Sequence, residues 1–306
     1  MNSDKRRKTK DERMAEADLH PVSFILRPSS LSVAIIARDE QRHIADALAS
    51  VEGLAAEVVV LLDSRTRDHT AQICQAHGAR VVVEAWRGYS AQRNRVLDLC
   101  TGDWVLLLDA DERLTAELAD EIYTLLRRDT QTRRYADTQT RSDLPASLSP
   151  DLRVSTSDIA GYWIPRYNCF FNQVVYGGGW YPDHQLRLLR RGRARYDEAR
   201  LVHEVAQLDG AAGYLDSHLL HLNVERLDEL WRKQTGYALY EAQTLYNAGA
   251  RARWRNFVGA PLREFCRRYL TLGGYRDGAI GLLLCGTLAY FEWVKYVHLK
   301  GLERAG

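Results

Sequence analysis

The chain has few cysteines, and their spacing suits neither metal binding nor disulfide pairing. Five are scattered through 306 residues, with no CxxC pair and no even count. This pattern argues against a zinc site and a disulfide framework, and it is typical of a reducing compartment. The cysteines are Cys74, Cys100, Cys169, Cys266 and Cys285.

Long apolar runs are also absent. The first twenty residues, MNSDKRRKTKDERMAEADLH, lack the apolar core of a signal peptide, so we expect no export. We expect residues 1–30 to form a basic flexible tail, with contact to anionic lipid or nucleic acid as the alternative. The uncharged run 278–291 has 14 residues, fewer than the ~20 that cross a bilayer. It therefore indicates a monotopic or re-entrant membrane contact.

The chain does contain regularly alternating strands and helices in its first third. Hydrophobic residues make up 46% and charged residues 27%, as in ordinary globular proteins. The alternation predicts βαβ units, and hence an α/β fold built on a mostly parallel sheet flanked by helices. The predicted strands are 32–37, 57–62, 80–84 and 104–108, and the predicted helices are 41–51, 70–77 and 92–99.

Three of these strands end in polar residues. The clusters are Arg38-Asp39-Glu40, Asp63-Ser64 and Asp109-Ala110-Asp111. Ligands of open α/β sheets gather beyond the carboxyl ends of parallel strands. We therefore expect all three clusters to lie along one ligand-binding edge.

The carboxylate pair Asp109 and Asp111 permits two interpretations. Mg²⁺ is usually held by one or two carboxylates together with waters and substrate phosphates, so the pair is a candidate metal site for a phosphate-bearing substrate. Acidic residues also favour helix N-termini, and residues 114–126 have the pattern of an amphipathic helix. We expect Glu112 to cap that helix.

The later part of the chain is less regular. Residues 128–158 repeat the pentapeptide DTQTR among serines, prolines and charges, which predicts a flexible insertion or lid. The three glycines Gly177-Gly178-Gly179 indicate a loop that is either mobile or closely approached by other backbone.

Residues 223–306 are predicted to be a helical, membrane-associating C-terminal region. The stretch RARWRNFVGAPLREFCRR, residues 251–268, interleaves arginines with aromatic and aliphatic residues, as in helices that lie on an anionic membrane. A solvated face over an ordinary core is the alternative. Rings and cations expected at the lipid headgroups follow at Tyr290, Trp293, Lys295, Tyr296 and Lys300.

Several motifs, taken together in order and spacing, carry a family resemblance. They are Arg38-Asp39-Glu40, Asp63-Ser64-Arg65-Thr66-Arg67-Asp68-His69-Thr70, Gln92-Arg93-Asn94, Asp109-Ala110-Asp111-Glu112, Trp180-Tyr181-Pro182-Asp183-His184-Gln185-Leu186-Arg187-Leu188 and Val202-His203-Glu204. The chain resembles family 2 glycosyltransferases of the GT-A fold, in the branch of the lipopolysaccharide-core β-glucosyltransferases. The resemblance implies a catalytic domain at residues 31–222, Rossmann-like in type.

The resemblance also assigns roles at the donor side. It implies that a nucleotide-sugar, most simply a UDP-sugar, lies across the strand ends, with Asp63 binding the base and Asp39 and Glu40 flanking the nucleotide. Asp109 would approach the ribose or sugar, and Asp111 would bind Mg²⁺ or Mn²⁺. Arg93 and Arg187 are further donor-binding candidates, and His203 is a further candidate metal ligand.

On the acceptor side, the resemblance implies an inverting transfer that needs a general base. Asp183 is the candidate for that base, and Glu204 is its competitor; the pair Pro182-Asp183 is also a common turn signal. Trp180 or Tyr181 would stack on a sugar. The loop 177–179 would form the mouth of the acceptor site.

Two pairs of arginines are relevant here: one pair consists of candidate phosphate ligands, and the other departs from the family pattern. Arg190 and Arg191 would pair with phosphate, as Arg187 would, because guanidinium matches it bidentately. Arg65 and Arg67 stand where the family usually has small residues.

The resemblance thus implies transfer of a hexose, expected to be glucose, to a lipid-linked saccharide such as the lipopolysaccharide core. The enzyme would act at the cytoplasmic face of the inner membrane, as a peripheral or monotopic protein, on an anionic surface and without a nucleic-acid partner. A polyprenyl-phosphate glycosyltransferase and a non-catalytic nucleotide-binding membrane protein are the alternatives. A nucleotidyltransferase would want a glycine-rich loop after the first strand, and residues 38–43 contain no glycine.

Overall fold

The computed structural model describes residues 31–138, 158–199 and 205–305. These residues form two compact units, which we name the sheet unit and the helical unit. Within the described ranges, the sheet unit contains residues 31–166 and 184–221, and the helical unit contains residues 167–183 and 222–305. The predicted tail 1–30 lies outside the described residues.

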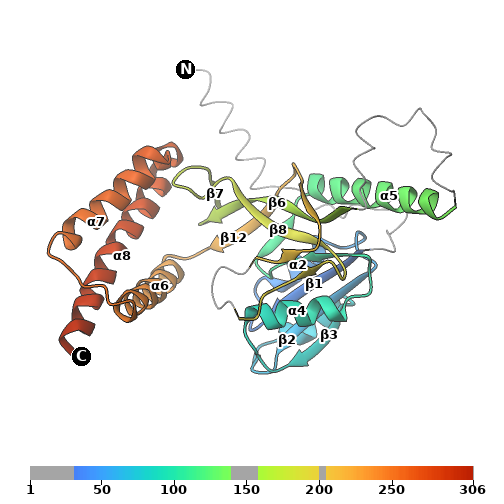
Figure 1. The fold of residues 1–306 in the computed structure, drawn as a ribbon, viewed down its shortest axis with the longest axis horizontal. Helices are drawn as coiled ribbons and strands as arrows, with labels where there is room; N and C mark the ends of the chain where they lie inside the picture. Colours follow the sequence, from blue (N-terminus) through green and yellow to red (C-terminus); the bar gives the residue numbers. More distant parts are fainter. Residues whose placement is uncertain (1–30, 139–157, 200–204, 306) are drawn as a thin grey trace, which may run out of the picture. The chain divides into compact units, whose positions relative to one another are not determined.

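The sheet unit begins with parallel strands joined by helices, as the alternation predicts (Figure 1). The strands lie in the order β3-β2-β1-β4. Their bounds are β1 Leu31–Ala37, β2 Glu57–Asp63, β3 Arg80–Glu84 and β4 Trp104–Leu107, and the helices are α2 Ile44–Ala49, α3 Thr70–Ala76 and α4 Tyr89–Leu99. Helix α4 begins three residues earlier than predicted, whereas α2 is shorter than predicted.

Strands β1, β2 and β4 are buried on both faces, which explains their nearly continuous apolar sequence. In β1, Val33 and Ile35 pack in one hydrophobic cluster with residues of α2, α3 and the later helix α5, Ala116–Thr138, whereas Ala34 packs in another with residues of α4. The two clusters occupy opposite faces because successive side chains of a strand alternate. The strand ends are therefore held at one rigid edge.

The remaining strands make the sheet mixed. Strand β8 pairs with β4 in the antiparallel direction, and the full order is β3-β2-β1-β4-β8-β6-β12-β5, with β7 and β11 both paired to β6. The predicted α/β fold with flanking helices is thus confirmed, with the parallel part confined largely to its first strands. The later strands are β5 Glu112–Leu114, β6 Ile159–Phe170, β7 Gln173–Val175, β8 Asp183–Arg190, β11 Ala211–Tyr214 and β12 Leu219–Val224, and β9 Ala194–Arg195 pairs with β10 Gln207–Leu208.

Helix α5, Ala116–Thr138, corrects the start of the predicted insertion. Residues 128–138 continue this helix, and Asp129 is buried within it. The Asp129 carboxylate accepts hydrogen bonds from the indole of Trp104 (3.0 Å) and from Arg190 (2.7 Å). This buried contact ties the helix to the sheet, and residues 139–157 lie outside the described residues.

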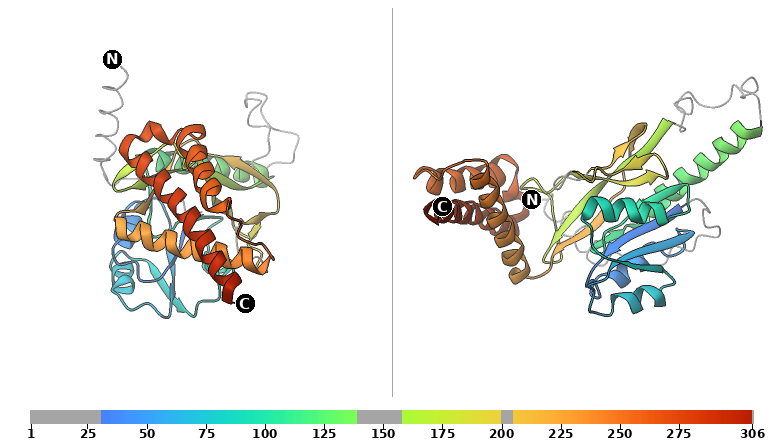
Figure 2. Two further views of the ribbon diagram at one scale, coloured as in Figure 1. Left: turned by 90° about the vertical axis from the view of Figure 1, so that its left-hand side faces the viewer. Right: turned by 60° about the horizontal axis from the view of Figure 1, so that its bottom comes forward.

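The helical unit is dominated by three helices. Helices α6, Leu227–Asn247, and α7, Asn256–Phe265, both pack against α8, Gly278–Ala305 (Figure 2). A π-helical turn, η3 Cys266–Thr271, and a 3₁₀ turn, η4 Gly274–Asp277, connect α7 to α8. Within the described residues, the segment Gly274–Ala305 is the one helical stretch long and apolar enough to cross a membrane, with a mean hydropathy of 1.3 in its best window.

Helix α8 is therefore longer than the uncharged run 278–291 indicates. Its 28 residues rise by about 42 Å, so the short length of that run does not by itself exclude a span. Lys295 corrects another expectation, because its side chain is only 12% exposed and its ammonium pairs with Glu241 at 3.0 Å. It is held between helices rather than presented to headgroups.

Candidate active site

The loops that follow β1 and β2 are bound to each other at the carboxyl edge of the parallel strands. The backbone N–H of Arg67 donates to the carboxylate of Asp39 (2.8 Å), and the N–H of Glu40 donates to the hydroxyl of Thr70 (2.8 Å). Asp39 has a left-handed backbone, with φ of 54°, a conformation that aspartate and asparagine tolerate better than most residues. The predicted clustering of polar strand ends along one edge is thus present.

Glu40 lies in a concentration of negative charge. Burial and the nearby carboxylates of Asp111, Asp68, Asp109 and Asp39 raise the pKa of Glu40 to about 7. So many acids converging at one edge favour the binding of a cation, which would relieve their mutual repulsion.

Asp63 is buried at the end of β2, and its carboxylate is already bonded. Arg65 donates to it from the side chain, at 2.6 and 3.1 Å, and from the backbone N–H at 3.0 Å. These hydrogen bonds lower the pKa of Asp63 to about 2. A nucleotide base that bound Asp63 would share this carboxylate with the half-exposed guanidinium of Arg65.

Asp109 is held by a buried arginine from another strand. Arg187 in β8 donates hydrogen bonds to Asp109 and, at 2.7 Å, to Glu112. Burial raises the pKa of Asp109, but the positive charges of Arg187 and Arg93 outweigh this effect and keep the pKa below its ordinary value. Arg187 is only 4% exposed, so in this structure it serves the acids rather than an external phosphate.

Glu112 is not the helix cap that the sequence predicts. It begins strand β5, is 0% exposed, and accepts hydrogen bonds from Arg187 and from Arg166 (2.8 Å) as well as from the backbone N–H of Asp109 (3.0 Å). Helix α5 begins only at Ala116. The acid is required inside the sheet unit as the counter-charge of two arginines that lie far along the chain.

Asp111 is paired with a histidine that sequence reasoning misses. Nε2 of His221, in β12, lies 3.3 Å from Oδ2 of Asp111. The residue gives no signal because it stands alone in an apolar strand sequence, LLHLNV. The predicted ligand His203 and the predicted competitor base Glu204 both lie outside the described residues. Within the described ranges, no group of three or more His, Cys, Asp or Glu side chains is arranged to hold a metal ion.

The other predicted arginines have different surroundings. The guanidinium of Arg93, on α4, lies 5.3 Å from the ring centre of Tyr196 and acts on Asp109 through its charge. Arg190 is buried, pairs with Asp129 and lies over the ring of Trp104 at 4.9 Å, so it is a structural residue rather than a phosphate ligand. Arg191 is exposed and donates to the carbonyl of Gly102 (2.9 Å).

In the helical unit, Asp183 stands at the start of β8 and is hydrogen bonded by an amide. Nδ2 of Asn168 donates to Oδ2 of Asp183 at 3.0 Å. Of the two rings expected to stack on sugar, Trp180 packs edge-on against Phe170 (5.5 Å) and lies under the guanidinium of Arg268 (5.2 Å).

Tyr181 instead belongs to a tyrosine cluster. It stacks on Tyr167 at 5.7 Å and meets Tyr176 edge-on at the same distance. Tyr176 is 39% exposed, so this cluster is partly accessible to solvent.

The loop at Gly177-Gly178-Gly179 is closely approached by backbone, the second of the two predicted alternatives. Asp277 accepts the N–H of Tyr176 (3.0 Å) and of Gly177 (2.6 Å), and Arg268 donates to the carbonyl of Gly178 (2.7 Å). A Cβ atom on Gly177 would lie 2.2 Å from the carbonyl oxygen of Gly273. No larger side chain fits there without movement of the backbone.

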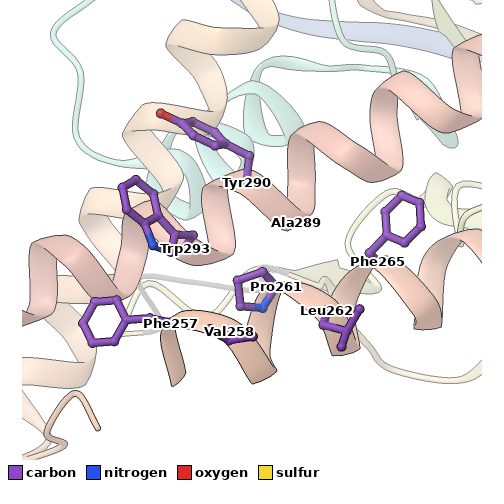
Figure 3. A pocket seen from close by; sticks show the side chains of 8 residues that line it. All are labelled: Phe257, Val258, Pro261, Leu262, Phe265, Ala289, Tyr290 and Trp293. Atoms are coloured by element: carbon purple, nitrogen blue, oxygen red, sulfur yellow. The ribbon is translucent and has the colours of Figure 1, made fainter. Parts of the chain in front are cut away.

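An open apolar groove of about 410 Å³ runs between α7 and α8 (Figure 3). Several of its side chains are well exposed, including Val258 at 66% and Leu262 at 60%. Exposed arginines, Arg251, Arg255 and Arg263 among them, lie on or next to α7. The lining residues are Phe257, Val258, Pro261, Leu262, Phe265, Ala289, Tyr290 and Trp293.

Comparison with known proteins gives the same classification as the sequence motifs. Residues 32–192 match the family model described as glycosyl transferase family 2. The lipopolysaccharide core biosynthesis glycosyltransferase LpsC of Rhizobium meliloti (strain 1021) is 28% identical over 275 residues, covering 86% of this chain and 89% of LpsC. An uncharacterised glycosyltransferase of Rickettsia conorii is 44% identical over 92 residues, 30% of this chain and 32% of that protein.

Two solved structures are also similar in part. A glucosyl-3-phosphoglycerate synthase from Mycobacterium tuberculosis, in complex with Mn²⁺, UDP and glucosyl-3-phosphoglycerate, is 29% identical over 28% of this chain and 34% of that one, with a TM-score of 0.25. TarS of S. aureus in complex with UDP is 12% identical, covers 90% of this chain and 92% of that one, and has a TM-score of 0.42. At these TM-scores neither structure bears on the arrangement of this chain.

Proposed function

Because this chain belongs to glycosyl transferase family 2, we propose that it transfers a hexose, with inversion, from a nucleotide diphosphate sugar to a saccharide of the lipopolysaccharide core. The acids that converge at the carboxyl edge of β1, β2 and β4 are the observation that carries this proposal. The acceptor class is supported by LpsC, a relative over most of both chains. UDP-glucose is the donor we expect.

A divalent cation, Mg²⁺ or Mn²⁺, would be held by Asp111 and His221. Their donor atoms are a carboxylate oxygen and an imidazole nitrogen 3.3 Å apart. Carboxylate suits both Mg²⁺ and Mn²⁺, whereas the imidazole suits Mn²⁺, a transition metal, better than Mg²⁺. The remaining positions would be filled by water and donor phosphates, with His203 as a further candidate. Such an ion, when bound, neutralises charge on the departing diphosphate.

We assign the other acids to different parts of the donor molecule. Asp39, Glu40 and Asp63 would contact the nucleotide, and Asp109 would face the ribose or the sugar. The pairing of Asp109 with Arg187 supports this division, because it keeps the first acid of the motif ionised and fixed while Asp111 serves the cation.

Asp183 would act as the general base that takes the proton of the acceptor hydroxyl, with Glu204 as the competing candidate. Its position at the start of β8 supports this role, because Arg187 lies four residues along the same strand. Residues two and four apart on a strand share a face.

The groove between α7 and α8 would rest on an anionic membrane in which the lipid-linked acceptor is embedded. Its exposed aliphatic and aromatic side chains suit the acyl boundary, and the neighbouring arginines suit anionic headgroups. We propose peripheral or monotopic attachment at the cytoplasmic face of the inner membrane. A polyprenyl-phosphate acceptor is the second candidate, favoured by the membrane-spanning length of α8.

A donor and acceptor panel tests the function. The full chain is incubated with UDP-, GDP- and ADP-sugars, with Mn²⁺ or EDTA, and with either a truncated core lipopolysaccharide or a polyprenyl phosphate. We expect metal-dependent transfer of a hexose from a UDP-sugar to the saccharide and loss of transfer in Asp183→Asn. Failure of every donor to bind would refute the enzyme proposal, and transfer to polyprenyl phosphate alone would favour the second candidate.

A further inference from the structure

Asn168 is a buried amide in β6 whose side chain holds two points of the chain at once. It is 3% exposed. Its Nδ2 donates one hydrogen bond to the carbonyl oxygen of Trp180 (2.9 Å) and another to Oδ2 of Asp183 (3.0 Å). Since an amide nitrogen carries two hydrogens, both are used. The side chain therefore fixes the turn 180–183 and the carboxylate that ends it.

The orientation of this amide is set by its neighbours. Oδ1 of Asn168 accepts from Nδ2 of Asn223 at 3.4 Å, and Oδ1 of Asn223 accepts from the ammonium of Lys233 at 3.0 Å. Every hydrogen bond of this series is donated in one direction along it, from Lys233 through the two amides to the carboxylate of Asp183. Rotation of either amide by 180° would place a donor against a donor or an acceptor against an acceptor.

We propose that Asn168 is a positioning residue for the base Asp183, an inference that rests on the proposed function. The amide does not take up the acceptor proton. It fixes the plane of the carboxylate, and with it the direction from which an acceptor hydroxyl can be deprotonated. A displacement of a catalytic group by about 1 Å can cost a factor of about 100 in rate, so such an anchor has a measurable effect.

The test compares kcat and KM in full-length variants. Asp183→Asn is measured first and should abolish transfer while leaving donor affinity nearly unchanged. Asn168→Ala should then lower kcat by about 10- to 100-fold, with the donor KM within about twofold of the wild type. Asn247→Ala is the matched control, since Asn247 is an exposed asparagine on α6 whose side chain accepts a hydrogen bond from Gln243; it should leave kcat unchanged.

Asn223→Ala separates positioning from simple structural support. It leaves Asn168 in place but removes the group that orients it, so we expect a smaller fall in kcat. The double variant Asn168→Ala/Asn223→Ala should be no slower than Asn168→Ala alone, because both changes act through one amide. Asn223→Ala also decides the question if Asn168→Ala does not fold, in which case an unchanged kcat overturns the inference.

Failure of the inference and failure of the proposed function give different results. If Asp183→Asn abolishes transfer but folded Asn168→Ala retains its kcat, the positioning role is refuted and the base assignment stands. If Asp183→Asn still transfers sugar, the base assignment itself is wrong. A fall in urea midpoint without a fall in kcat per folded molecule would assign Asn168 to stability alone.

Discussion

Arg187 lies against Asp109 and neutralises the first acid of the Asp109-Ala110-Asp111 motif from the neighbouring antiparallel strand. The second acid has a different partner, the imidazole of His221. Two carboxylates separated by one small residue therefore have distinct environments. Asp109 is bound to the guanidinium of Arg187, whereas Asp111 lies beside an imidazole, a side chain that commonly ligates metals.

Replacement of Arg187 should destabilise the fold strongly. In Arg187→Met, Asp109 would lose this counter-charge, and the fully buried Glu112 would keep only one of its two arginine partners, Arg166. We therefore expect the free energy of unfolding to fall by about 3–5 kcal/mol. Urea denaturation measures this. Arg87→Ala, which removes an exposed pair with Glu84, should cost less than about 1 kcal/mol. Equal losses in the two variants would argue against a buried ion network.

Removal of either proposed metal ligand should weaken cation binding. We expect Asp111→Asn and His221→Ala each to reduce Mn²⁺ affinity in the presence of UDP by at least about tenfold, as measured by calorimetry. His218→Ala is the control: His218 directly precedes strand β12, which carries His221, and its replacement should leave Mn²⁺ binding unchanged. Unchanged affinity in His221→Ala would remove His221 from the site and favour His203.

Stability should depend on pH through Glu40. Its folded pKa of about 7 lies above the ordinary value of 4.5, so the folded state binds the proton more tightly. The stability that this gives is complete below about pH 4.5 and is lost as the pH rises through 7. Glutamine does not titrate, so Glu40→Gln should not show this loss. The free energy of unfolding of the variant minus that of the wild type should therefore rise by about 1–2 kcal/mol from pH 4.5 to pH 8, after allowance for solvent screening. Urea midpoints at several pH values measure the difference, and a constant difference would contradict the shift.

Two glycines should respond oppositely to alanine. Gly177→Ala forces a Cβ against the carbonyl of Gly273 and displaces the N–H groups bound by Asp277, so we expect a loss of about 1–3 kcal/mol. Gly259 lies within α7, and a Cβ atom there would meet nothing within 4 Å, so Gly259→Ala should gain up to about 1 kcal/mol through helix propensity. Thermal unfolding of both variants checks the signs, and a tolerated Gly177→Ala would mean that the loop yields easily.

An acidic substitution in the groove should weaken membrane binding. Leu262→Asp places a charge among apolar side chains that are proposed to meet the acyl boundary, so the bound fraction should fall several-fold in sedimentation with anionic liposomes. Val83→Asp is the control, because Val83 is 58% exposed on strand β3 of the sheet unit. Equal binding of the two variants would refute the role of the groove.

The fold can be predicted from the sequence to the extent that it depends on local periodicity. Strands β1 to β4 are identifiable because each is an apolar run followed by polar residues, and their parallel pairing places those residues at one edge. The sequence does not predict the full length of helix α5. Residues 128–138 are polar and carry no helical signal of their own, so the predicted helix ends before them. Their helix is retained in part by the buried contact of Asp129 with Trp104 and Arg190, which are distant along the chain.

The site is predictable in its acids but not in their partners. Asp39, Asp109 and Asp111 follow strands and Asp63 ends one, so all four can be recognised from that position alone. The expectation for Glu112 is wrong because its counter-charges are 54 and 75 residues away, and only the sheet order brings them to it. The pairing of His221 with Asp111 depends in the same way on long-range topology. The assignment of Asp183 as the base stays a prediction.

The two hydrogen bonds that Asp277 accepts from the loop before β8 set a limit on how this enzyme can be recombined with its relatives. A chimera that exchanges only the C-terminal helices would replace Asp277 by the corresponding residue of the relative. The N–H groups of Tyr176 and Gly177 would then need new hydrogen-bond acceptors. Residues 167–183 and 222–305 belong to one compact unit although they are separate in sequence, so they should be exchanged together. Because the proposed base Asp183 lies in the first of these segments, a test of its role by recombination needs both segments from the same relative.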